Sequence, residues 1–190
     1  MPERQSLPEF AKTITSMNRL LYLQEYDCPA LLQVTDTEGQ VLSLDEQKRL
    51  LCKKVRRVTQ DMIKTPLETA AFLLPDRNPL PASFFFIRNS GSNANRSFIG
   101  VGTDPTCDLT FPEEDLSLRH GFFKDVNGMS FTDAGSKNGT FHNGVKLAPR
   151  KSKKLTNHDE LRFGERACFI FLSVHGFYDL VRACSLSLSQ

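Results

Sequence analysis

The second half of the chain consists of short apolar stretches separated by turns of glycine, asparagine and aspartate, and this pattern limits the possible folds most strongly. Many short strands at such close spacing predict antiparallel sheets, packed as a sandwich or closed as a barrel. An Asn-Gly pair in the turn 126–129 favours a tight hairpin between two of them. The predicted strands are 83–88, 97–102, 108–111, 121–125, 130–133, 140–142, 160–163 and 168–173.

The first part of the chain has a helical pattern instead. Ser6 with Glu9, and Ser43 with Glu46, form capping-box sequences that predict two helix starts. Apolar residues then recur at helical spacing, and a third short helix is predicted at 66–74. The apolar stripes are Phe10, Ile14, Met17 and Leu21 in the first helix, and Leu51, Val55, Val58 and Met62 in the second.

Three prolines between residues 75 and 81 mark a linker between two kinds of structure. We predict an α+β chain with an N-terminal helical segment at 1–78, an antiparallel β-sandwich at 82–174 and a short C-terminal helix and tail at 175–190. Amphipathic helices of this kind are not stable alone in water, so they must pack on each other, on the sandwich or on a second copy of the chain. A homo-oligomer formed through the N-terminal helices is therefore one hypothesis.

The composition disfavours several classes of protein. Hydrophobic residues make up 39% of the 190 residues and charged residues 24%, which suits a packed core better than a disordered chain. The five cysteines lack C-x-x-C spacing and the four histidines are scattered, so we predict reduced thiols, no metal site and no cofactor. No signal-peptide pattern, membrane span or catalytic motif is found, which predicts a cytoplasmic protein that is not an enzyme.

Three loops of the strand-rich half carry the groups that can bind a ligand: 102–108, 115–120 and 135–144. Loops at one end of a rigid sandwich can place such groups side by side. A phosphate group has three acceptor oxygens and nearly two negative charges, so its site needs convergent donors and at least one cation. The candidate groups are the hydroxyl of Ser117, the side-chain amide of Asn138 and the charges of Arg119 and Lys137.

The loop residues follow one another in a recognisable order: Gly102, Asp108, Ser117 with His120, 136–144 and then 159–164. In this order they resemble the forkhead-associated (FHA) domain, a phosphothreonine-peptide binding module. The resemblance implies an FHA-like sandwich that binds a protein partner through these loops. The implied phosphopeptide-binding residues are Thr103, Ser117, Leu118, Arg119, Lys137 and Asn138. The residues expected to shape the loops are Gly102, His120, Gly139 and Asn143.

Two of these positions depart from the family pattern. Thr103 stands where the family has an arginine that contacts phosphate, and Leu118 stands where a second arginine is frequent. Loss of one charge-assisted hydrogen bond to phosphate weakens binding by about 1.5–3 kcal/mol. Arg119 can supply the missing charge only if its side chain faces the loops, because alternation along a strand would aim it elsewhere.

Three functional hypotheses follow for a non-enzymatic adaptor in signalling or assembly. The first is protein recognition that depends on phosphothreonine, and the second is a phosphate-independent scaffold or oligomerisation protein of the same fold. The third is attachment to nucleic acid or another polyanion through the basic helix 48–57, which the lack of interleaved aromatic residues disfavours. The basic clusters are Lys48, Arg49, Lys53, Lys54, Arg56 and Arg57, and then Lys146, Arg150, Lys151, Lys153 and Lys154.

Overall fold

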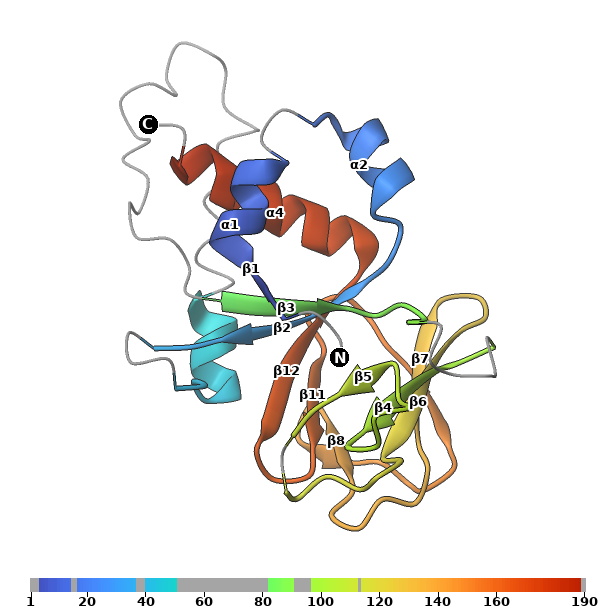
Figure 1. Cartoon of the computed structure of the whole chain (residues 1–190). Coiled ribbons are helices and arrows are strands. Elements are labelled where there is room, and N and C mark those ends of the chain that lie inside the picture. The colour runs from blue at the N-terminus through green and yellow to red at the C-terminus, as the bar shows by residue number, and fades with distance from the viewer. Residues whose placement is uncertain are drawn as a thin grey trace.

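The computed structural model describes residues 4–14, 17–36, 40–50, 82–90, 97–112 and 114–188. These residues form two β-sheets that pack on each other, and helices gather over the β1-β3-β2 side of the larger sheet (Figure 1). The predicted fold class is confirmed: a β-sandwich with an N-terminal helical segment and a C-terminal helix, antiparallel apart from the strands at 99–102 and 109–110, which pair in parallel. The division of the chain at residues 78–82 stays a prediction.

The smaller sheet has five strands in the order β10-β7-β6-β4-β5. Their bounds are Ile99–Gly102 for β4, Leu109–Thr110 for β5, Gly121–Asp125 for β6, Met129–Asp133 for β7 and Ser152–Lys154 for β10. Strand β7 alternates buried and half-buried residues, so one of its faces packs against the other sheet. Asn127 and Gly128 have positive φ angles of 60° and 103° between β6 and β7, which agrees with the predicted hairpin.

The larger sheet has seven strands in the order β1-β3-β2-β12-β11-β8-β9. Their bounds are Gln5–Ser6 for β1, Ala30–Val34 for β2, Ala82–Phe86 for β3, Thr140–His142 for β8, Val145–Lys146 for β9, Glu160–Phe163 for β11 and Ala167–Leu172 for β12. Strand β2 corrects the sequence analysis, which expected only helices before residue 75. Leu32 of β2 packs in the core under the helices and Leu31 in the core between the sheets, so both faces are buried and no polar alternation marks the strand.

The helices also differ in part from those predicted. Their bounds are Leu7–Thr13 for α1, Arg19–Glu25 for α2 and Val174–Leu188 for α4, and residues 44–50 are helical as well. The single helix expected from Phe10 to Leu21 is wrong, because Asn18 accepts the Leu21 N–H at 2.9 Å and begins a new helix. Leu20 and Leu21 are 75% and 51% exposed, so the apolar stripe does not continue into α2.

Ser43 caps the helix at 44–50 as predicted, but Glu46 bonds the Ser43 hydroxyl instead of the main-chain N–H of a full capping box. The Glu46 N–H donates to Ser43 Oγ at 3.4 Å, and the Ser43 hydroxyl donates to the Glu46 carboxylate at 2.7 Å. Buried Gln47 joins this helix to the larger sheet, because its Oε1 accepts the Val34 N–H at 3.0 Å. The apolar stripe predicted from Leu51 onward and the third helix at 66–74 lie outside the described residues.

Two apolar cores hold the layers together. One lies between the helices and the larger sheet, where the rings of Phe10, Phe84 and Phe177 meet with centroids 4.7–5.9 Å apart. The other lies between the two sheets, where Phe131 contacts Phe123 at 4.8 Å and Phe163 at 5.0 Å. Aromatic pairs at these distances add to the stabilisation from burial alone, so the sandwich is a rigid support for its loops.

The described residues contain no helix with the length and apolar character needed to cross a membrane. Within the same residues, no three histidine, cysteine or acidic side chains group closely enough to hold a metal ion. Among the described residues, Cys28, Cys107, Cys168 and Cys184 form no disulfide with one another, whereas Cys52 lies outside the described ranges.

Candidate functional site

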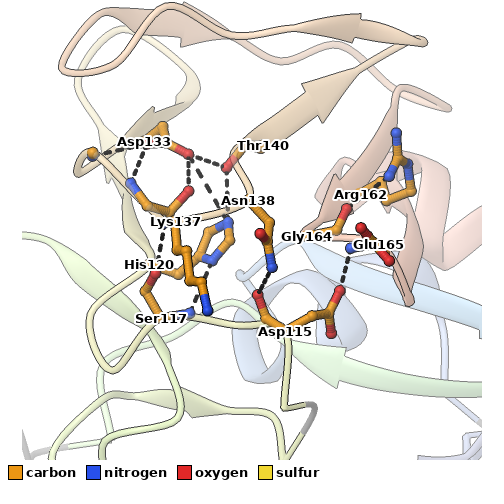
Figure 2. Close-up of polar contacts among 12 residues, drawn as sticks. Asp115, Ser117, His120, Asp133, Lys137, Asn138, Thr140, Arg162, Gly164 and Glu165 are labelled. Atoms are coloured by element: carbon orange, nitrogen blue, oxygen red, sulfur yellow. Dashed lines mark hydrogen bonds and ion pairs between the residues drawn. The ribbon is translucent and has the colours of Figure 1, made fainter.

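At one end of the sandwich, hydrogen bonds join the second and third predicted loops (Figure 2), and the first predicted loop bonds to the second. The Thr103 N–H donates to the Ser117 carbonyl oxygen at 3.2 Å, which joins the first loop to the second. The Lys137 N–H donates to Ser117 Oγ at 2.9 Å, and Asn138 Nδ2 donates to the Asp115 carbonyl oxygen at 2.8 Å. These bonds place the ends of strands from both sheets in one surface, which we call the three-loop surface (residues 102–108, 115–120 and 135–144).

Ser117 stands at the centre of the three-loop surface. Its hydroxyl oxygen already accepts the Lys137 N–H, so its own O–H remains able to donate to a ligand. The Ser117 N–H donates to His120 Nδ1 at 3.4 Å. Ser117 is therefore fixed by its main chain and side chain while one donor stays available.

His120 lies fully buried beneath Ser117 and does not reach the surface. Since Nδ1 accepts from Ser117, the proton is on Nε2, which faces Thr140 Oγ1 at 3.2 Å. Burial lowers the pKa of His120, which keeps the ring neutral and allows Nδ1 to act as an acceptor. The predicted structural role of His120 agrees with this position.

Asp133 anchors the third loop from below and was not among the predicted residues. Its carboxylate accepts the Thr140 hydroxyl at 2.7 Å, the Ser136 hydroxyl at 2.7 Å and the N–H groups of Gly135 and Ser136 at 2.8 and 2.9 Å. Burial raises the pKa of the Asp133 carboxyl, but these hydrogen bonds outweigh burial and the pKa lies below its usual value. The sequence signal that could have found it is an aspartate two residues before a glycine, which is typical of a turn closed by a side chain.

Asp115 supports the second loop in the same way and was also missed as a site residue. Its side chain accepts the Glu165 N–H and, at 3.1 Å, the Arg166 N–H, while its main-chain oxygen accepts from Asn138. The Gly164 N–H donates to the Gly139 carbonyl oxygen at 2.9 Å. The loops are thus tied to the turn between β11 and β12.

Leu118 and Arg119 project from the three-loop surface into solvent. Leu118 is 68% exposed, and the side chain of Arg119 is 79% exposed. Arg119 Nε lies 3.9 Å from the Asp104 carboxylate, so a residue that the sequence analysis did not single out partly neutralises the candidate cation. The N–H and hydroxyl of Thr106 donate to Asp104 and lower its pKa, so that carboxylate is charged at neutral pH.

The glycines of the pattern permit close approaches of the main chain. A Cβ on Gly102 would lie 2.0 Å from the Leu118 carbonyl oxygen, so only glycine allows β4 to touch the second loop. Gly139 has a φ of 82° and lies under the Lys146 side chain. Asn143 bonds to Asp159 at 2.9 Å and to the Glu160 N–H at 2.8 Å, and so links β8 to β11.

All six predicted binding residues lie on the three-loop surface, but they differ in exposure. Leu118, Arg119 and Lys137 are exposed, whereas Thr103, Ser117 and Asn138 are half-buried. Their participation in ligand binding stays a prediction. The predicted basic helix at 48–57 lies mostly outside the described residues, and Lys48, which is described, forms an ion pair with Glu160 at 2.7 Å.

Comparison with known proteins supports the sequence resemblance. Residues 99–164 match the family model described as FHA domain. Among solved structures, the yeast Dun1 FHA domain in complex with a doubly phosphorylated peptide is 22% identical, with a TM-score of 0.43 over 78% of this chain and 76% of that chain. The FHA domain of CT664 protein from Chlamydia trachomatis is 16% identical, with a TM-score of 0.42 over 76% of this chain and 97% of that chain.

A third similar structure, Mycobacterium tuberculosis EmbR in complex with a low affinity phosphopeptide, is 18% identical, with a TM-score of 0.37. The match covers 40% of this chain and spans only 20% of the EmbR chain. A search of curated protein sequences gave no match. The sandwich of this chain has the FHA-like fold, and the resemblance drawn from its loops is confirmed by the family model.

Proposed function

We propose that this chain is a non-enzymatic protein-recognition module that binds a segment of a partner protein at the three-loop surface. The observation that supports this proposal most directly is the fixed position of Ser117 among three hydrogen-bonded loops, with Leu118, Arg119 and Lys137 exposed around it. Groups that are held in place before binding lose little freedom when a ligand arrives. The surface thus suits recognition of a peptide better than chemical change of one.

Each candidate group of the three-loop surface has a distinct role in such a complex. The Ser117 hydroxyl can donate to an acceptor on the partner. One side-chain N–H of Asn138 donates to Asp115, and the other can donate to the main chain of the partner. Lys137 and Arg119 favour an acidic or phosphorylated partner residue. Leu118 offers an apolar contact beside them.

The first prediction concerns the binding residues themselves. We expect Ser117→Ala and Asn138→Ala each to weaken partner binding by about tenfold, because each removes one hydrogen bond worth about 1.4 kcal/mol. Affinity is measured by titration with matched phosphorylated and unphosphorylated threonine peptide libraries. Ser152→Ala, on exposed strand β10, is the control and should bind as the unchanged protein does. If both loop variants capture partners normally, the three-loop surface is not the site.

Dependence on phosphothreonine is the finer hypothesis, and the site geometry argues in both directions. Ser117, Lys137 and Arg119 supply a donor and two cations. Thr103 adds no charge where the family has an arginine, and the Asp104 carboxylate partly neutralises the charge of Arg119. We therefore propose a partner segment that binds without phosphate and gains only a small further affinity when phosphorylated.

The second prediction tests the effect of Asp104 on phosphate. We expect Asp104→Asn to strengthen binding of a phosphorylated peptide by about threefold and to leave the unphosphorylated peptide unchanged, because Arg119 loses its competing carboxylate. The asparagine keeps one side-chain oxygen for Thr106. Asp125→Asn, on the exposed end of β6, is the matched control. Equal gains for the two peptides, or none for either, would contradict this role.

Two other hypotheses have less support. The basic helix at 48–57 is described only for its first residues, of which Lys48 is already paired with Glu160. Leu20 and Leu21 on α2 are exposed apolar residues of the N-terminal helices that a second copy of the chain could contact. Homo-oligomerisation through the N-terminal helices, an adaptor role in signalling and a cytoplasmic location stay predictions, and the first is tested by a mass measurement with light scattering.

A further inference from the structure

The second basic cluster of the sequence lies on an open edge of the sandwich. The structure divides the cluster, because Lys146 lies on β9 of the larger sheet whereas 152–154 form strand β10 of the smaller one. Strand β10 is the outermost strand of its sheet, and residues 150–154 are all exposed. Four of these five residues are lysine or arginine. Positive charge is therefore concentrated along one edge.

The strand register adds a further lysine from the neighbouring part of the sheet. Ser130 of β7 lies opposite Lys124 of β6 on one side and opposite Lys154 of β10 on the other. Directly opposite residues of an antiparallel sheet point to the same face, so both lysine side chains leave the outer face, from main-chain positions about 10 Å apart. We call the set Lys124, Arg150, Lys151, Lys153 and Lys154 the basic edge.

An aromatic pair borders the basic edge on the same face. Phe122 lies two residues before Lys124 on β6, and alternation places the two side chains on one face. Its ring meets the ring of Phe98 with centroids 5.1 Å apart and an interplanar angle of 45°. Both rings are half-buried. The outer face thus offers apolar surface next to positive charge.

Within the described residues, this charge has no acidic partner and no cover. Neither Lys124 nor Lys154 forms an ion pair there. Helices α1 and α4 pack on β1, β3 and β12 of the larger sheet, away from β6 and β7 (Figure 1). Lysines on an outermost strand can be explained without a ligand, because they prevent that strand from pairing with strands of other molecules. Lys124 does not fit that explanation, because it lies on an inner strand.

We propose that the basic edge binds an acidic polypeptide segment of a partner protein. Its charge is complementary to such a segment, and the Phe98–Phe122 pair offers an apolar contact beside it. The Leu155 N–H donates to the Met129 carbonyl oxygen of β7. Because the main-chain N–H and C=O groups of successive residues point to opposite sides of a strand, those of Lys154 point away from β7, where an extended peptide can pair. Rings tilted against each other and half-buried are a poor platform for stacked bases, which favours a polypeptide over a nucleic acid.

The experiment compares two variants with the same change in charge. Binding of a fluorescent oligoglutamate peptide and of single-stranded oligothymidylate of equal length is measured by anisotropy with the full chain. We expect the peptide to bind, and Lys124→Glu with Lys154→Glu to weaken it about tenfold. Arg4→Glu with Lys12→Glu, two exposed N-terminal positions, should change its affinity less than about twofold. Circular dichroism verifies that both variants are folded.

Three outcomes would overturn the proposal. The first is no binding of oligoglutamate, which leaves protection of the sheet edge as the role of the lysines on β10. The second is an equal loss in both double variants, which means that only net charge matters. The third is tighter binding of oligothymidylate than of the peptide, which makes nucleic acid the partner. None of these depends on Ser117 or Asn138, so the proposal about the three-loop surface is tested separately.

Discussion

Replacing Asp133 with alanine is expected to lower the free energy of unfolding by about 4 kcal/mol. Asp133 as a whole residue is 1% exposed, and its carboxylate accepts four hydrogen bonds from the loop that begins directly after it. Its removal leaves the buried Thr140 hydroxyl and the loop N–H groups without their acceptor. Thr140 also faces His120, so the loss extends to the group that positions Ser117.

Urea unfolding followed by fluorescence or circular dichroism measures this change. Asp125→Ala is the control, because Asp125 is exposed at the end of β6 in the same sheet. We expect that control to stay within about 0.5 kcal/mol of the unchanged protein. A loss below about 1 kcal/mol in Asp133→Ala would mean that water replaces the carboxylate and that the loop does not depend on it.

The same network predicts how stability depends on pH. Because hydrogen bonds lower the folded-state pKa of Asp133 below 3.8, its contribution is complete above that value and is lost as pH falls through the folded pKa. Because burial lowers the pKa of His120 below 6.5, the unfolded chain binds its proton first and stability declines as pH falls below that value. Asp133→Ala should reduce the first decline, to which the lowered carboxyl pKa values of Asp104 and Asp159 also contribute, and keep the second.

Replacing Gly102 with alanine is expected to cost about 3 kcal/mol and to separate the first two loops. The added Cβ would lie 2.0 Å from the Leu118 carbonyl oxygen and 3.0 Å from that of Ser117. Those atoms are main chain and cannot turn aside as a side chain can. The same movement would break the hydrogen bonds that Thr103 and Asp104 donate to the second loop, so partner binding should fall together with stability.

Gly144→Ala is the matched control for this substitution. Gly144 has a φ of 78° but nothing within 4 Å of an added Cβ, so alanine there reports the cost of conformation alone, about 1 kcal/mol. Unfolding in urea measures the stability of both variants, and titration with a peptide that binds the unchanged protein measures their affinity. Equal stability of the two variants would show that β4 and the second loop can move apart without cost.

Strands β6, β8 and β11 could be predicted because each of them is flanked by a turn and buries one face. The predicted bounds of β6, β8 and β11 agree with the structure. Strand β2 was missed because all five of its residues are buried, and an apolar run without alternation does not distinguish strand from helix. Strands β1, β9 and β10 were missed because two or three edge residues are too few to show a period.

The surface residues of the site could be predicted in part, because the spacing of Ser117, His120 and Asn138 is read directly from the sequence. What could not be predicted is which groups already have partners. Asp104 and Arg119 are fifteen positions apart in the chain, and their ion pair depends on how two loops fold against each other. The sequence also did not reveal whether the Arg119 side chain faces the loops. In the structure this side chain is 79% exposed and contacts Asp104 of the first loop.

The position of β2 has a consequence for the speed of folding. Leu31 of β2 pairs with Phe171 of β12, so the larger sheet joins strands that are distant in the sequence. The three loops, in contrast, connect strands from the middle of the chain. Contacts between residues so distant in sequence are slow to form, because a large loop must close first. A substitution in β2 would therefore alter how fast the protein folds, while a substitution of Ser117 would alter how tightly the folded protein binds its partner.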